Sequence, residues 1–304
     1  MGGLTCAHGF VTGCFGTYQA RALPPPRIDM TNYSAHINED VLRTWFSAKT
    51  LADPQLARFI ETHDLQKIKP TFKDICNRLF GCDNPYHAYR PELLPSPMSY
   101  TPHIGPATLG AIEAALGRRP SFGLEVGSFI GSSATILGSW LRETGGTLMC
   151  IDTWCGDINM WLLGNFSGTM RKMDGNPVIF DHFMNAMFNN GLTETVVPFR
   201  VSSIVAARTL KVLNYDIDFV YLDSAHECGE TFLELSLYYD LLPQGGVIIG
   251  DDYLMFPAVK HDVDLFCKIN NLQLNFTGEG DTWLIQKPVH VETAAVVEAV
   301  AEDA

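Results

Sequence analysis

The stretch from Asp216 to Tyr253 constrains the fold more than any other part of the chain. It contains two short apolar runs, 219 to 222 and 246 to 250, and each run halts at an aspartate. The residues between them, 229 to 242, have helical spacing, and the Pro-Gln-Gly-Gly sequence at 243 to 246 ends that helix. A strand, a helix and a second strand joined in this way form a right-handed crossover in a parallel sheet. The sequence therefore predicts an α/β protein.

Acidic side chains follow both strands of this unit. Asp223 follows the first strand, and Asp251 and Asp252 follow the second. Because parallel strands end at one edge of a sheet, and open α/β sheets bind ligands there, we expect the three carboxylates to lie together at a ligand site. Like charges repel, so such a cluster needs protonation, solvent or a cation, and oxygen ligands favour Mg²⁺. His226 and Cys228 keep a softer metal conceivable. The alternative is that one aspartate only caps the following turn.

His226 follows Asp223 by three residues and is predicted to lie at the same edge. An imidazole titrates near neutral pH, so it can take a proton from a substrate hydroxyl. We expect His226 to be the general base, although a lone histidine is more often structural. The other histidines weighed are expected to be structural: His87, His103, His182 and His261. Of these, His103 or His182 could touch substrate.

Residues 122 to 131 resemble part of a dinucleotide fingerprint. Residues 122 to 126 form a predicted strand that contains Glu125, and Gly127 and Gly131 form the turn before a helix. The fingerprint needs a further glycine where the backbone approaches a pyrophosphate, and Phe129 stands there instead. This bulky residue disfavours NAD. The motif suits a nucleoside with an amine and a carboxylate but no phosphate.

Further predicted elements complete one sheet. Strands are expected at 147 to 151, 195 to 201, 273 to 277 and 282 to 286, and helices at 39 to 47, 53 to 62, 71 to 80, 106 to 116 and 257 to 270. Asp152 ends the first of these strands, where a nucleoside ribose is usually bound. The tight turn at 278 to 281 makes the last strand antiparallel to its neighbour. The segment 158 to 188, helical from 178, is long enough to cover a substrate, or its apolar residues pack as core.

Charge and cysteine content exclude several classes of partner. The net charge is -13, without a cluster of basic residues, so nucleic acid and anionic membranes are poor partners. None of the apolar runs approaches the length of about 18 residues that a membrane span needs. The eight cysteines include no CxxC pair, which favours free thiols in a reducing compartment, and we expect a cytoplasmic protein.

The motifs together resemble those of a class I S-adenosylmethionine-dependent methyltransferase. They are Glu125-x-Gly127-x-x-x-Gly131, Asp152 at a strand end, the Leu-Pro-Gln-Gly-Gly sequence at 242 to 246 and the closing strand pair. Asp152-Thr153-Trp154 with Gly156-Asp157, Asp223-x-x-His226 and Asp251-Asp252-Tyr253 are similar to the metal-dependent sugar O-methyltransferases of the macrocin and mycinamicin type, and to the cephalosporin-hydroxylase-like group. The resemblance covers about residues 106 to 288. It implies a Rossmann-like, seven-stranded, mostly parallel sheet with an antiparallel last strand and helices on both faces. The helical patterns between residues 39 and 80 predict an N-terminal helical cap in addition.

The resemblance also implies roles for individual residues. Contacts with the methionine part of S-adenosylmethionine would come from Glu125, Gly127, Ser128 and Gly131, with Asp223 nearby. Asp152 would bind the ribose, Trp154 would lie beside the adenine and Ser203 would stand near that base. Asp223, Asp251 and Asp252 would bind Mg²⁺ or another divalent cation. The sequence departs from the family pattern at Val201-Ser202-Ser203, where a Gly-Asp-Ser-like sequence is common, and at Cys228, where a tyrosine is common.

The expected function is transfer of a methyl group to a hydroxyl of a sugar, a glycoside or another vicinal diol, by an enzyme of secondary metabolism. Alternatives are a catechol-type phenol O-methyltransferase, a cephalosporin-hydroxylase-like enzyme and a non-catalytic nucleoside-binding protein. The expected domains are a loose extension (1 to 36), a helical cap with a Pro/Tyr-rich loop (37 to 105), the methyltransferase domain (106 to 288) and a tail (289 to 304). A homo-oligomer is one expected form.

Overall fold

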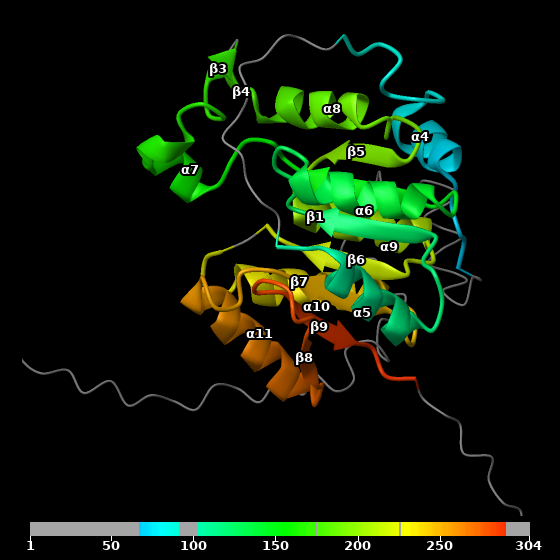
Figure 1. The fold of residues 1–304 in the computed structure, drawn as a ribbon, viewed down its shortest axis with the longest axis vertical. Coiled ribbons are helices and arrows are strands. Elements are labelled where there is room, and N and C mark those ends of the chain that lie inside the picture. Colours follow the sequence, from blue (N-terminus) through cyan, green and yellow to red (C-terminus); the bar gives the residue numbers. More distant parts are fainter. Residues whose placement is uncertain (1–66, 91–102, 174, 225, 290–304) are drawn as a thin grey trace, which may run out of the picture.

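One seven-stranded sheet organises the computed structural model, which describes residues 67–90, 103–173, 175–224 and 226–289 (Figure 1). The strand order is β5-β2-β1-β6-β7-β9-β8. The strands are β1 (Phe122–Val126), β2 (Thr147–Asp152), β5 (Val196–Arg200), β6 (Phe219–Leu222), β7 (Val247–Gly250), β8 (Leu274–Phe276) and β9 (Trp283–Gln286). The pairs formed by β5, β2, β1, β6 and β7 are parallel, whereas β9 is antiparallel to both of its neighbours. This confirms the predicted Rossmann-like sheet.

Helices cover both faces of the sheet (Figure 1). On one face, α5 (Pro106–Leu116), α6 (Ser132–Arg142) and α8 (Ile179–Asn189) contribute to one apolar cluster. On the other face, α9 (Ser203–Leu213), α10 (Glu230–Leu241) and α11 (Pro257–Asn270) contribute to a second cluster. The strands divide between the clusters with the period of two expected for a sheet, since Val220 and Leu222 face the second cluster while Phe219 and Tyr221 face the first.

The predicted crossover unit is β6, α10 and β7. In the register of β6 and β7, Leu222 is paired with Gly250. The chain therefore leaves both strands at the same level, with Asp223 after one and Asp251 after the other. This register is what sets the acidic residues side by side.

Some elements were not predicted. The helix α9 begins after Ser202, whose side chain accepts a hydrogen bond from the backbone N–H of Val205, and ends at Asn214 in the left-handed region. Its buried positions include Ala206 and Ala207, so the apolar pattern is weak although the cap is a recognisable signal. The long 158 to 188 segment contains α7 (Ile158–Leu162), a 3₁₀ turn (Gly164–Phe166), and a two-stranded hairpin, β3 (Lys172–Met173) and β4 (Asn176–Pro177), before α8.

The described part of the N-terminal region packs on the sheet. The predicted helix at 71 to 80 is α4 (Phe72–Phe80), which begins with a capping box between Thr71 and Asp74. Its residues Ile75 and Cys76 are fully buried in the second apolar cluster. The other predicted cap helices, residues 1 to 36 and most of the tail lie outside the described residues. Within the described ranges, no helix is both long enough and apolar enough to cross a membrane.

Candidate active site

Three aspartates lie at the carboxyl-end edge of the sheet, as the strand pattern predicted. The backbone N–H of Asp223 donates to the carbonyl of Val126 (2.9 Å), and the N–H of Asp251 donates to the carbonyl of Leu222 (3.1 Å). Asp252 has a φ of 65°, a left-handed conformation that is uncommon for a side chain other than glycine. The strand ends thus fix the backbone positions of all three carboxylates.

The electrostatics of this edge disfavour the ionised carboxylates. Burial raises the pKa of Asp223 well above its usual value, and the charges of Asp251 and Asp252 raise it further. Burial is also the main cause that raises the pKa of Asp251, whose Oδ2 lies 3.4 Å from the hydroxyl of Tyr221. The fold therefore holds like charges together at a cost, and a bound cation would relieve this repulsion.

His226 lies between two carboxylates. Its Nδ1 is 3.3 Å from Oδ2 of Asp157, and its Nε2 is 2.8 Å from Oδ2 of Asp252. The ring stacks on Phe256, with centroids 4.3 Å apart. Burial alone would lower the pKa of His226, but the hydrogen bond with Asp157, the close carboxylate of Asp252 and the charge of Asp223 raise it to about 10. Without a compensating cation the imidazole is protonated at neutral pH.

The donor set fits a divalent cation. Two groups of potential ligands have their ligand atoms within 4.8 Å of one another: Asp223, His226 and Asp252, and His103, Asp251 and Asp252. The Nε2 atom of His226 is buried, and although it is close to Asp252 it has no partner with hydrogen-bond geometry among the described residues. Carboxylate oxygens that converge on one region beside an imidazole nitrogen are a set of donors that a divalent cation can use. The predicted aspartate triad is thus divided, with Asp252 shared between the groups.

His103 also lies at this edge, and it is one of the two histidines that the sequence analysis allowed could touch substrate. Its Nδ1 lies 3.0 Å from Oδ2 and 3.2 Å from Oδ1 of Asp251. The segment is held in place because the backbone N–H of Thr108 donates to Oε2 of Glu279 (2.8 Å). The sequence carries no signal for this contact, since His103 and Asp251 are 148 positions apart and only the fold brings them together.

Glu125 and Gly127 shape the turn after β1 rather than expose polar atoms. The Glu125 side chain is fully buried, and it accepts hydrogen bonds from Oγ of Ser133 (2.6 Å) and Sγ of Cys150 (3.2 Å). Burial raises the pKa of its carboxyl group. Gly127 has a φ of 90°, and a Cβ there would lie 1.9 Å from the carbonyl oxygen of Asp223. Ser128 is almost fully buried in the same turn, and Gly131, with a φ of 88°, begins α6.

Asp152 ties this turn to the end of β2. Its Oδ2 accepts a hydrogen bond from the N–H of Phe129 (2.8 Å), and its Oδ1 accepts one from the N–H of Trp154 (2.6 Å). Burial is the main cause that raises the pKa of Asp152. The backbone N–H groups of Ser128 and Thr153 also hydrogen bond to this carboxylate, so backbone donors surround it.

Trp154 lies in the core rather than on a wall open to an adenine. The side chain is 0% exposed and packs against Phe180 and Phe183, both with ring centroids 4.8 Å away. Its indole N–H donates to the carbonyl of Phe129 (2.8 Å). The apolar residues of the long insertion therefore bury this indole, and here the alternative of core packing holds.

Ser203 starts α9 next to α10. Its carbonyl accepts a hydrogen bond from the hydroxyl of Tyr238 (2.8 Å), and its side chain hydrogen bonds to the buried carboxyl group of Glu234. Ser224 also donates to Glu234 (2.5 Å), and burial raises the pKa of that carboxyl group. Ser224 and Glu234 line the same hollow as Asp223 and His226. Glu234 and Asp157 are site residues that sequence reasoning did not assign.

The chain is similar to one protein family and to several solved structures. Residues 124–253 match the family described as "Methyltransferase domain". Among solved structures, the O-methyltransferase NovP has 20% identity and a TM-score of 0.46, over 63% of this chain and 84% of its own. The methyltransferase PaMTH1 of Podospora anserina, bound to SAH, has 16% identity and a TM-score of 0.43, over 62% of this chain and 81% of its own. CalS11, a TDP-rhamnose 3'-O-methyltransferase, has 15% identity and a TM-score of 0.43, over 59% of this chain and 77% of its own. No curated protein matches the sequence.

Proposed function

We propose that this chain, whose residues 124–253 match a methyltransferase-domain family, transfers the methyl group of S-adenosylmethionine to a hydroxyl of a small molecule. The observation that carries the proposal is the placement of His226 at the acidic edge of that domain, with Nδ1 near Asp157 and Nε2 directed at Asp252. A hydroxyl is a poor nucleophile until it is deprotonated, and methyl transfer is an in-line displacement. A base at the ligand edge is the group that this chemistry needs.

The cofactor would lie along the turn between β1 and α6. Asp152, at the end of β2, would accept hydrogen bonds from the ribose hydroxyls. The turn that contains Gly127 and Gly131 would hold the methionine part, with Glu125 acting from the interior through its bonds to Ser133 and Cys150. S-adenosylmethionine lacks a phosphate, so Phe129 does not obstruct it as it would obstruct a pyrophosphate.

His226 would act as the general base, and Asp157 would orient it. When Asp157 accepts a hydrogen bond from Nδ1–H, the lone pair is on Nε2, the atom that faces the acidic edge. The neighbouring carboxylates keep the pKa of His226 high, and a cation held by Asp223 and Asp252 would lower this pKa by offsetting their charges. The proton then moves from the acceptor hydroxyl to Nε2.

Asp223, Asp251 and Asp252 would hold a divalent cation, with Asp252 as the carboxylate common to both candidate ligand groups. The cation would be Mg²⁺, because these ligands are rich in carboxylate oxygen. When bound, such an ion supplies Lewis acidity that makes a nearby hydroxyl easier to deprotonate. His103 is placed to orient Asp251 through the contact at Nδ1. Two adjacent oxygens of a vicinal diol would fix the acceptor, which supports a sugar or glycoside and leaves a catechol as the second candidate.

Exposed apolar side chains flank the acidic edge, and they support an acceptor with an apolar portion. Four lie on or directly after α7, next to Asp157, and two lie between β7 and α11: Ile158, Trp161, Leu162, Leu163, Leu254 and Met255. A polar centre with an apolar rim is typical of small-molecule sites. An unmodified monosaccharide would use little of this surface, so we propose a glycoside with an apolar aglycone.

Calorimetric titration of the metal-free protein tests the proposal. S-adenosylmethionine should bind in the micromolar range, and NAD should not bind. Each ligand is titrated with and without Mg²⁺. Methyl transfer to a panel of glycosides and catechols should then be stopped by a chelator and restored by Mg²⁺. Binding of NAD, or of neither nucleoside, would refute the assignment.

Two variants separate the roles at the acidic edge. Asp252→Asn should abolish the dependence on Mg²⁺ and reduce turnover by at least about 100-fold, whereas Asp240→Asn, whose carboxylate pairs with Lys211 on the surface, should leave both unchanged. His226→Ala should lose turnover but retain the affinity for Mg²⁺ and for the cofactor. If His226→Ala instead loses its affinity for Mg²⁺, the residue is a ligand rather than the base.

A further inference from the structure

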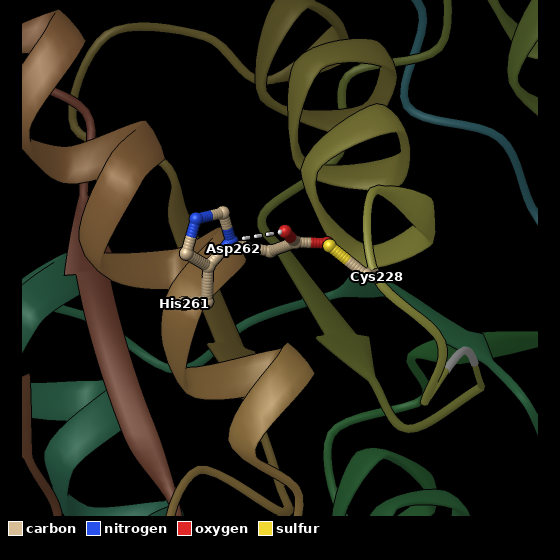
Figure 2. A group of neighbouring side chains, drawn as sticks. All are labelled: Cys228, His261 and Asp262. Carbon is tan, nitrogen blue, oxygen red and sulfur yellow. Dashed lines mark hydrogen bonds and ion pairs between the residues drawn. The ribbon is translucent and has the colours of Figure 1, made fainter. Parts of the chain in front are cut away.

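A second group of metal-ligating side chains lies between α10 and α11, separate from the acidic edge. Figure 2 shows Cys228, from the loop before α10, beside His261 and Asp262 of α11. One ligand atom from each residue lies within 4.8 Å of the other two. The three ligands differ in type, since they offer a sulfur, a nitrogen and an oxygen.

Asp262 is the member of this group whose side chain is held in one position. Its side chain is 1% exposed, and its Oδ2 accepts hydrogen bonds from the backbone N–H groups of Gly229 (2.7 Å) and Phe232 (3.2 Å). These bonds hold the carboxylate against the first turn of α10 and leave Oδ1 directed toward His261, whose Nδ1 is 3.0 Å away. Capping of α10 accounts for Oδ2 alone. It does not account for the imidazole at Oδ1 or for the thiol beside the carboxylate.

The spacing suits a tetrahedral ion. Two nitrogen or oxygen ligands of one zinc ion are about 3.3 Å apart when each is at the usual bond length, close to the observed 3.0 Å between Nδ1 and Oδ1. Cys228 and His261 are exposed, so their side chains can rotate to complete the geometry, and water can fill a fourth position. Thiolate and imidazole ligands select zinc over magnesium.

We infer that Cys228, His261 and Asp262 bind a soft divalent cation of the zinc type. The inference does not rest on the proposed function, because none of the three residues is assigned to the acidic edge. Cys228 is two residues after His226 in the same loop. An ion at this site would therefore connect the loop that carries His226 to α11 and restrict its movement.

Cobalt titration of the chelator-treated full-length protein tests the inference. Co²⁺ bound to a thiolate gives a near-ultraviolet charge-transfer band, which Co²⁺ bound only by carboxylates and imidazoles at the acidic edge does not give. The wild-type protein should show the band, and addition of Zn²⁺ should remove it. Cys228→Ser should lose the band, and His261→Ala should lose or greatly weaken it.

Cys155→Ser is the matched control, because Cys155 is also an exposed free cysteine but lies after β2. This variant should keep the full band. Cys228 and His261 are exposed, so their substitution should leave the folded state intact. Circular dichroism spectra of the variants can verify this. Absence of the band in the wild-type protein, or its survival in Cys228→Ser, would overturn the inference.

Discussion

Asp218 shows how one buried carboxylate can stabilise the start of a strand. Its side chain is fully buried, and its Oδ2 accepts hydrogen bonds from the backbone N–H groups of Ser121 (2.7 Å) and Phe122 (2.9 Å). Its Oδ1 forms ion pairs with Lys69 and Arg118. Burial alone would raise its pKa, but these hydrogen bonds hold the pKa below the usual value. The residue thereby joins β1 and β6 to the N-terminal segment.

We predict that Asp218→Asn lowers the free energy of unfolding at neutral pH by about 2–3 kcal/mol, since charge-assisted hydrogen bonds to a buried carboxylate are lost. The pKa of Asp218 is lower in the folded protein than in the unfolded chain, where an aspartate has a pKa of about 3.9. Asp218 therefore stabilises the fold at pH values above the unfolded pKa, and this contribution is lost as the pH falls through the folded pKa. The difference between wild type and variant, measured by urea denaturation, should therefore shrink below about pH 4. Asp216→Asn, which removes an exposed partner of Lys69, should cost less than about 1 kcal/mol.

At the scale of elements, the turn after β1 depends on the closeness of β6. The absent side chain at Gly127 lets the backbone pass next to the carbonyl of Asp223, and the φ of 90° suits glycine. The glycine that the sequence pattern linked to a cofactor thus also has a packing role. Both roles require the same small residue.

Gly127→Ala should destabilise the protein by about 3 kcal/mol or more, because it adds a steric overlap to a strained backbone conformation. The comparison is Gly110→Ala in α5, where a Cβ meets nothing within 4 Å. That change should raise the free energy of unfolding by up to about 1 kcal/mol, as expected for glycine in a helix. Thermal denaturation of both variants measures these changes in stability. Equal changes in Gly127→Ala and Gly110→Ala would contradict the packing role of Gly127.

At the scale of the whole molecule, the acidic edge lowers the free energy of unfolding of the metal-free protein at neutral pH. The pKa of Asp223 is raised well above its usual value by burial and by its acidic neighbours, so the folded state binds a proton that the unfolded chain releases. The stability of the metal-free protein should therefore decline as the pH rises from about 4 through the folded pKa. The effect of rising pH on stability is therefore opposite to the effect that Asp218 has.

We expect Asp223→Asn to be more stable than the wild type in the presence of a chelator, by at least about 1 kcal/mol at pH 8, with a smaller gain at pH 5. Excess Mg²⁺ should stabilise the wild type and narrow or reverse the difference, since only the wild type gains the bound ion. Chemical denaturation at the two pH values measures this. A destabilised metal-free variant would show that Asp223 serves the fold and carries no electrostatic penalty.

The sequence alone determined the order of the elements and the edge at which the chemistry lies. Short continuous apolar runs that stop at aspartates, and a helix between them, define β6, α10 and β7 because such a crossover has one favourable hand. Local signals that mark the ends of elements, such as Pro257 as the first residue of α11, were sufficient. The helix α9 was missed because small residues on its buried face give a weak apolar pattern.

Only the tertiary structure decided which side chains meet. The contact between His103 and Asp251, the partners of His226 and the division of the aspartates into two groups depend on packing between distant segments. Trp154 followed a strand end in the sequence and looked available to a ligand, yet Phe180 and Phe183 of the long insertion bury it. A sequence pattern fixes where the backbone of a residue leaves its strand, but the direction of the side chain follows from what the rest of the chain packs against it.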